Sequence, residues 1–312
     1  MHQAHTNKPS KFDDDINFLK LADVLWQEKW IISSVTTFVS IILIIYSLFM
    51  PNIYESKALL ARVDSSNVIS GALSSYSALA GIAGIRLPSG GENGNSAKAI
   101  EKVSSLSFFE NNILTNIYLP DLMAVKSWDF KTNNLAYDKT IYDSKSSTWV
   151  RTYSYPQQQI PSAQESFEVF QERHFKLNED VQSGFITLSI KHQSPFVAKQ
   201  WVELVVDELN NFYRQKDKLE SHKAISYLNQ QISMTNFSEI KEALAQLVQE
   251  ETKKLTLIEA NQYYVFEYIE PPAVMEKKAG PQRLLIGILG TLLGSMLSIV
   301  IILLRKYFFK KA

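Results

Sequence analysis

Residues 284–304 read LLIGILGTLLGSMLSIVIILL and contain no charged side chain. A helix needs about 20 apolar residues to cross a hydrocarbon core of roughly 30 Å, and this run is long enough. A second uncharged run, residues 31–50, reads IISSVTTFVSIILIIYSLFM, and its serines and threonines can bond to the helix backbone. The sequence therefore predicts a transmembrane helix near each end of the chain.

The first run differs from a cleaved secretory signal, which also combines a basic start with an apolar stretch. It begins about thirty residues into the chain, and it is longer than the usual apolar region of about 7–15 residues. Met50 and Pro51 follow it, where a signal would carry a small-x-small cleavage site. Trp26, Trp30 and Tyr307 lie near the ends of the two runs, where aromatic rings favour the headgroup layer. We therefore favour two retained anchors.

Two spans place both termini on one side of the membrane. Cytoplasmic segments carry an excess of Lys and Arg. Six lie near the spans on the terminal side: Lys20, Lys29, Arg305, Lys306, Lys310 and Lys311. Five lie on the other side: Lys57, Arg62, Lys277, Lys278 and Arg283. This narrow margin favours cytoplasmic termini. The predicted order is a cytoplasmic tail at 1–30, transmembrane helix 1 at 31–50, a periplasmic domain at 51–283, transmembrane helix 2 at 284–304 and a cytoplasmic tail at 305–312.

Composition excludes several classes of partner and site. The 312 residues include 32 basic and 32 acidic side chains, so the chain lacks the basic excess of nucleic-acid-binding proteins. Cysteine is absent, which removes disulfides, thiolate nucleophiles and cysteine-ligated zinc. No G-x-x-x-x-G-K-[ST] sequence occurs, so we expect no ATP chemistry in this chain.

The segment between the runs predicts an α+β fold. Strands are expected at 54–63, 184–190 and 263–269, and helices at 99–111 and 162–177. A Ser-, Ala- and Gly-rich stretch at 65–97 predicts a loop. In residues 118–161 the apolar side chains follow neither a helical nor a strand spacing, so this stretch is left unassigned. We expect a mixed α/β base near the membrane, with long helices projecting from it.

Those long helices are predicted over about 195–260, as a hairpin. Pro195 opens the first, because proline suits the first helical turn, and an apolar stripe follows it: Val197, Trp201, Leu204, Val205 and Leu209. If this helix continues to about residue 231, its length is roughly 55 Å. Asn236 with Glu239 resembles a capping pair and predicts the start of the second helix.

The order of these features resembles the Wzz-type chain-length determinants, the polysaccharide co-polymerases. The similarity lies in the strand Tyr54-x-x-x-Ala58, the helix PFVAKQWVELVVDELN at 195–210, the hairpin, and the approach EPPAVMEKKAGPQR at 270–283. Met275 and Lys278 depart from the family pattern, where further prolines are common. The resemblance implies an inner-membrane protein with a periplasmic domain that forms closed homo-oligomeric rings. It also implies control of the modal length of an O-antigen-type glycan, which grows on a lipid carrier through a separate polymerase.

Two sets of candidate site residues follow. Gly287, Gly290, Gly294 and Ser298 form a stripe of small residues on the second span, and such stripes let helices pack closely in lipid. Their expected partner is the first span or a neighbouring subunit. Pro271, Pro272 and Pro281 form a membrane-proximal proline motif that the resemblance singles out.

For the other candidate binding sites, a purely structural role is the better explanation. The loop at 90–94 (GGENG) suits a flexible turn better than a phosphate site, since no Lys-Ser/Thr follows it. The histidines lack metal-ligand spacing, and Asp13, Asp14 and Asp15 are typical of a solvated tail. We expect no catalytic residue, cofactor site or metal site.

Three other functions remain as alternatives to a non-enzymatic length regulator. An adaptor for capsule or exopolysaccharide export shares the two-span plan. A periplasmic sensor is disfavoured by the short tail after residue 304. A hydrolase or transferase is the least favoured, because no catalytic motif stands out.

Overall fold

The computed structural model describes residues 26–63 and 94–309, with side chains up to Arg305. The chain divides into two compact units. One contains the helices near the two termini, and the other comprises residues 52–279. The acidic run at 13–15 and nearly all of the loop predicted at 65–97 lie outside the described residues. The end of that predicted loop is helical, because helix α4 already begins at Gly94.

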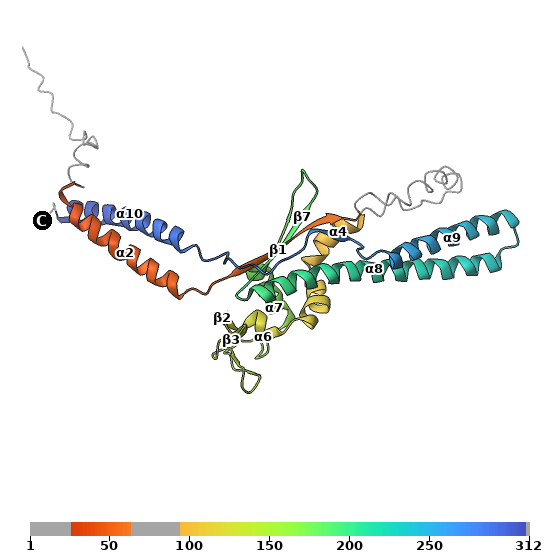
Figure 1. Cartoon of the computed structure of the whole chain (residues 1–312), viewed down its shortest axis with the longest axis horizontal. Coiled ribbons are helices and arrows are strands. Elements are labelled where there is room, and N and C mark those ends of the chain that lie inside the picture. Colours follow the sequence, from red (N-terminus) through yellow and green to blue (C-terminus); the bar gives the residue numbers. More distant parts are fainter. Residues whose placement is uncertain (1–25, 64–93, 310–312) are drawn as a thin grey trace, which may run out of the picture. The chain divides into compact units, whose positions relative to one another are not determined.

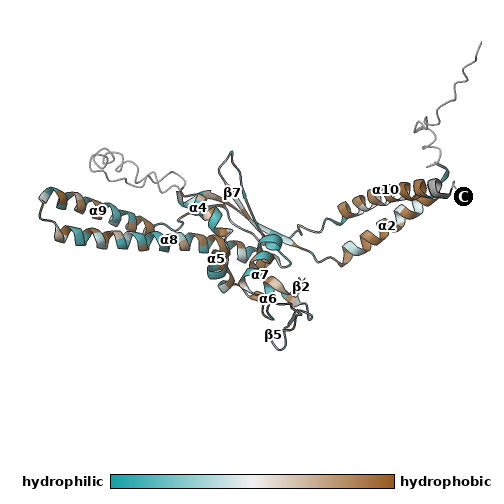
Figure 2. Cartoon of the chain, turned by 180° about the vertical axis from the view of Figure 1, so that it is seen from behind, coloured by the Kyte–Doolittle hydropathy of each residue, from teal (hydrophilic) through white to brown (hydrophobic). Residues whose placement is uncertain are grey.

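The terminal unit pairs helix α2 (Lys29–Phe49) with helix α10 (Arg283–Phe309), and both are long and apolar enough to cross a membrane. At 1.5 Å per residue, α2 extends about 32 Å. The most apolar windows of the two helices are only 11% and 22% buried. A core helix of a soluble domain would be mostly buried, so the predominantly apolar surface of these helices (Figure 2) suits a lipid environment.

The second unit is built on a four-stranded antiparallel sheet in the order β6-β7-β1-β8. Its strands are β1 (Tyr54–Arg62), β6 (Phe175–Glu179), β7 (Ile186–His192) and β8 (Phe266–Glu270). Strand β1 buries Ser56, Ala58 and Leu60, in the alternation expected of a strand. The three predicted strands are confirmed, although the last begins at Phe266. The strand after α2 and the last strand of this unit are neighbours.

Helix α8 (Pro195–Met234) packs on strands β1 and β7, and helix α9 (Ser238–Ala260) runs back along it (Figure 1). The Ser194 hydroxyl accepts the Val197 N–H at the start of α8, and Pro195 occupies the first turn as predicted. The predicted cap at Asn236 is wrong. Phe237 is the residue before α9, and no side chain caps this end of the helix. The backbone carbonyl of Phe237 accepts the Lys241 N–H at 3.0 Å.

The helix predicted over 99–111 is interrupted. Helix α4 (Gly94–Val103) ends, and α5 (Leu106–Phe108), a π-turn (Phe109–Ile113) and a 3₁₀ turn (Leu114–Asn116) follow. The Ser105 hydroxyl accepts the Phe108 N–H at 3.4 Å, and serine favours such caps over helix interiors. The break buries Phe108, Phe109 and Ile113 together in the core.

The helix predicted over 162–177 ends early. Helix α7 (Ala163–Val169) passes into a π-turn (Phe170–His174), and the chain then becomes strand β6. Phe175 pairs with Ile190 of β7 and stacks on Phe170 with ring centroids 5.5 Å apart. Pairing with the sheet thus overrides the helical period of the sequence.

Residues 118–161, which the sequence leaves unassigned, form a small addition. Helix α6 (Leu119–Met123) leads into the hairpin of β2 (Val125–Asp129) and β3 (Asn134–Tyr137). Two short strands, β4 (Tyr142–Asp143) and β5 (Thr148–Trp149), complete it. Ala124, Tyr142 and Trp149 form its own small core.

Candidate functional site

The two terminal helices meet at the glycine face of α10. A Cβ added to Gly294 would lie 3.0 Å from Cα and 3.2 Å from the carbonyl oxygen of Thr36. One added to Gly290 would lie 3.0 Å from a leucine side chain of α2. At Gly287 the nearest atom of α2 is 3.9 Å away, which is ordinary contact. Gly290 and Gly294 therefore allow an approach that a larger side chain would block.

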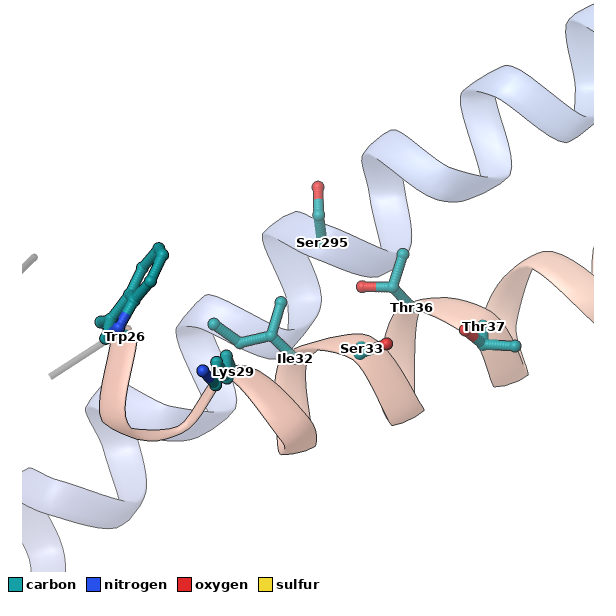
Figure 3. Close-up of a pocket in the computed structure, with 7 residues that line it drawn as sticks. All are labelled: Trp26, Lys29, Ile32, Ser33, Thr36, Thr37 and Ser295. Atoms are coloured by element: carbon teal, nitrogen blue, oxygen red, sulfur yellow. The ribbon is translucent and has the colours of Figure 1, made fainter.

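Small polar side chains continue this face. Ser298 is fully buried, and its hydroxyl donates to the Ser295 carbonyl at 2.7 Å. On α2, the Ser40 hydroxyl donates to the Thr36 carbonyl at 2.8 Å. Figure 3 shows Thr36 and Ser295 beside the shallow hollow along the first half of α2. The Ser40 and Ser298 hydroxyls bond to carbonyls of their own helices, so they form no hydrogen bond between the helices. Their small size is what allows the two helices to pack closely. The role of the stripe in lipid stays a prediction.

The proline motif lies on the segment that follows β8. Pro271 is exposed, whereas Pro272 is buried and Pro281 is partly buried. Around them the backbone is held against the start of β1. The Ser56 hydroxyl donates to the Ala273 carbonyl at 2.8 Å, and the Ala279 N–H donates to the Ile53 carbonyl at 2.8 Å. These bonds hold the segment that contains Met275 and Lys278.

A buried amide joins helix α8 to strand β8. Asn210 Oδ1 accepts the backbone N–H groups of Tyr264, Val265 and Phe266 at 3.2, 2.7 and 3.0 Å. Its Nδ2 donates to the Phe266 carbonyl at 3.0 Å. Sequence reasoning missed this residue. The available signal was an asparagine four positions after Val206 on the apolar face of the helix.

A buried carboxylate extends the same connection. Asp217 accepts the Tyr264 hydroxyl at 2.5 Å and the Asn95 side-chain amide at 2.7 Å, and it is 7% exposed. Burial and the hydrogen bond to Asp217 raise the pKa of Tyr264. Helix α4, helix α8 and the residues before β8 therefore share one polar network, which the sequence pattern did not predict.

Two histidines pack on Trp201 beneath the sheet. The His192 and Trp201 ring centroids are 5.1 Å apart, and those of His174 and Trp201 are 5.5 Å apart. His192 Nδ1 accepts the Ser194 N–H, and its Nε2–H donates to the Asp121 carbonyl, both at 3.0 Å. Burial lowers the pKa of both histidines, to about 4 for His174. This neutral pair orders the start of α8.

These groups are suited to holding elements together. Within residues 26–63 and 94–305, no three His, Asp or Glu side chains gather in a way that could hold a metal ion. Gly94, the last residue of the candidate phosphate loop, begins helix α4, and the rest of that loop lies outside the described residues.

Comparison with known proteins supports the resemblance seen in the sequence. The family model for Wzz, chain length determinant protein, matches residues 14–113, which include α2 and β1. The chain is similar to this family over those residues. The match does not reach the proline motif at 271–281. No curated protein matches the chain.

Solved structures of polysaccharide co-polymerases are also similar to this chain. A full-length bacterial polysaccharide co-polymerase is 16% identical, with a TM-score of 0.40, and the alignment covers 95% of this chain and 99% of that one. A fragment of WzzB, a polysaccharide co-polymerase from Salmonella Typhimurium, is 12% identical with a TM-score of 0.33. That alignment covers 73% of this chain and 100% of the fragment.

Proposed function

We propose that this Wzz-like chain sets the modal length of a bacterial surface polysaccharide of the O-antigen type. It acts without catalysing a reaction, as an oligomeric ring in the inner membrane. Its partners are a separate polymerase and the growing lipid-linked glycan. The observation that carries the proposal is the match of residues 14–113 to chain length determinant proteins.

The placement in the membrane belongs to the same proposal. Helices α2 and α10 cross the inner membrane, the segments at 1–30 and 305–312 are cytoplasmic, and residues 51–283 are periplasmic. Two observations support it: both helices are long, apolar and mostly unburied, and the lysine and arginine count favours cytoplasmic termini.

The long hairpin suggests how a scaffold would act. Helix α8 contains 40 residues, so it extends about 60 Å, which exceeds the size of a compact domain. Asn210 and Asp217 tie it to β8 and α4. A rigid helix of this length presents an extended surface to a growing glycan and its polymerase. The ring repeats that surface around an axis.

Deleting the gene and separating the surface glycans on a gel tests this function. The expected result is loss of the modal band while polymer is still made, with restoration by the intact gene. An unchanged band pattern contradicts the proposal. Disappearance of the polymer from the surface, together with dependence on an ATP-driven exporter, would instead identify an export adaptor.

A further inference from the structure

The turn of the β2–β3 hairpin is held in one conformation. Asp129 accepts the Lys131 N–H at 2.9 Å and the Thr132 hydroxyl at 2.8 Å. The Trp128 indole N–H donates to the Asn133 side-chain oxygen at 2.8 Å, and Asn133 adopts a left-handed φ of 54°. Side-chain bonds of this kind stabilise turns and tolerate that backbone conformation. The tip of the hairpin is therefore a fixed surface.

Trp128 attaches the hairpin to the end of the sheet where β1 begins. Its ring meets Tyr54 edge-on with centroids 5.4 Å apart, and it lies 6.2 Å from the Phe196 ring. Tyr54 is the first residue of β1, and Phe196 is the second residue of α8. The Gln193 amide adds a hydrogen bond of 3.0 Å to the Val125 carbonyl. The hairpin thus cannot swing away from the start of β1 without breaking these contacts.

Chain connectivity limits how far Tyr54 can lie from the end of α2. Four residues separate Phe49, the last residue of α2, from Tyr54. A fully extended chain of that length reaches at most about 18 Å. The headgroup layer on each side of the hydrocarbon core is roughly 5–8 Å deep. Where α2 crosses a membrane, Tyr54 and the ring of Trp128 packed on it are therefore within reach of this layer.

The hairpin exposes side chains that favour that layer. Phe130 is 72% exposed, and Lys126 and Lys131 are exposed on the same hairpin. The Lys131 ammonium lies 5.9 Å from the centre of the Phe130 ring. Aromatic rings concentrate at the membrane interface, and lysine reaches anionic headgroups while its stem lies along apolar groups. Asp129 carries the opposite charge, and its oxygens accept the hydrogen bonds that fix the turn.

We propose that the β2–β3 hairpin is an interfacial anchor, with Phe130 and Lys131 at its tip in the lipid headgroup layer. The hairpin thereby holds the start of the sheet against the bilayer. This inference rests on the proposed crossing of the membrane by α2 and α10. Exposed aromatic rings also suit sugars, and the short connection to α2 is what favours lipid as the partner.

The chain contains no cysteine, so single labels can be placed without background. We would attach a nitroxide to Lys131→Cys in the full chain, reconstituted in vesicles of phosphatidylethanolamine and phosphatidylglycerol. Collisions with oxygen report lipid, and collisions with a nickel chelate report water. Val181→Cys, at a 90% exposed residue between β6 and β7, gives the aqueous reference. Leu297→Cys, on the exposed side of α10, gives the bilayer reference.

The label at residue 131 should lose most of its accessibility to nickel relative to residue 181. Adding Phe130→Ser should restore part of the accessibility to nickel, because the proposed anchor depends on the Phe130 ring. If the label were shielded only because the hairpin lies close to the membrane, removing this ring would have no effect. A label as accessible to nickel as residue 181, or one shielded only when glycan is added, overturns the inference. Water accessibility at residue 297 would overturn the proposed membrane anchoring itself, which distinguishes the two failures.

Discussion

Asn210 supplies hydrogen bonds that a neighbouring strand would otherwise provide. It bonds to the backbone of residues 264–266 from inside the core. Asn210→Ala should therefore destabilise the fold, since each buried group left unpaired costs about 1–3 kcal/mol. Thermal unfolding of the full chain in detergent measures this. The neighbouring Asn211 is exposed, so Asn211→Ala is the matched control. Equal midpoints for the two variants would contradict the role of Asn210.

The buried histidines predict a loss of stability in mild acid. The pKa of His174 is lowered from 6.5 to about 4, first by burial and then by the repulsion between the two rings when His192 is also protonated. A group whose folded pKa is depressed contributes stability above its unfolded pKa. That stability is lost as the pH falls from about 6.5 toward 4, because only the unfolded chain binds the proton.

His174→Gln tests this pH dependence. Glutamine can still donate to the Lys191 carbonyl, which His174 Nδ1 contacts at 2.7 Å, but it does not titrate. The unfolding midpoint of the variant should fall less between pH 6.5 and pH 4 than that of the parent chain. His222 is exposed, so His222→Gln should keep the parental slope. A parental slope in His174→Gln as well would show that the buried pair does not control the acid response.

At the scale of elements, the packing of α10 on α2 depends on two glycines. Leucine at Gly290 and Gly294 would place side-chain atoms where a Cβ alone already comes within 3.0 Å of α2. We expect Gly290→Leu with Gly294→Leu to separate the helices, and so to shift the glycan length distribution or weaken the oligomer. Gly287→Ala is the control, because the added Cβ would lie 3.9 Å from the nearest side-chain atom of α2, which is ordinary contact. Unchanged glycan length and oligomer in the double variant would remove the claim.

The predictable elements are those whose signal is local. Uncharged runs defined α2 and α10 to within a few residues, apart from the C-terminal end of α10, and Pro195 marked the start of α8. Strand β6 was missed because its helical period is overridden by pairing with β7. The hairpin of β2 and β3 was missed because its contacts with Tyr54 and Phe196 join distant parts of the sequence. The glycine stripe was visible in the sequence, whereas Asn210 and Asp217 gain their meaning only from their long-range partners.

At the scale of the whole molecule, the far half of the α8–α9 hairpin leaves apolar side chains uncovered. Tyr227, Met234, Phe237 and Ile240 are 48–68% exposed among the described residues. A pair of helices has one shared seam, so it cannot bury apolar groups on other faces. Exposed apolar surface of this kind is typical of protein interfaces, and the proposed ring would cover it with a second copy.

Met234→Gln with Phe237→Gln should therefore shift the purified chain toward smaller assemblies, as measured by mass photometry in detergent. The fold should survive, because the two side chains are 68% exposed and contribute little to the core. Val181→Gln replaces an even more exposed apolar residue outside the hairpin and should leave assembly unchanged. If the double variant assembles like the parent chain, the subunits meet elsewhere. If both variants dissociate, the effect reflects general surface polarity, and the hairpin has no special part in the ring.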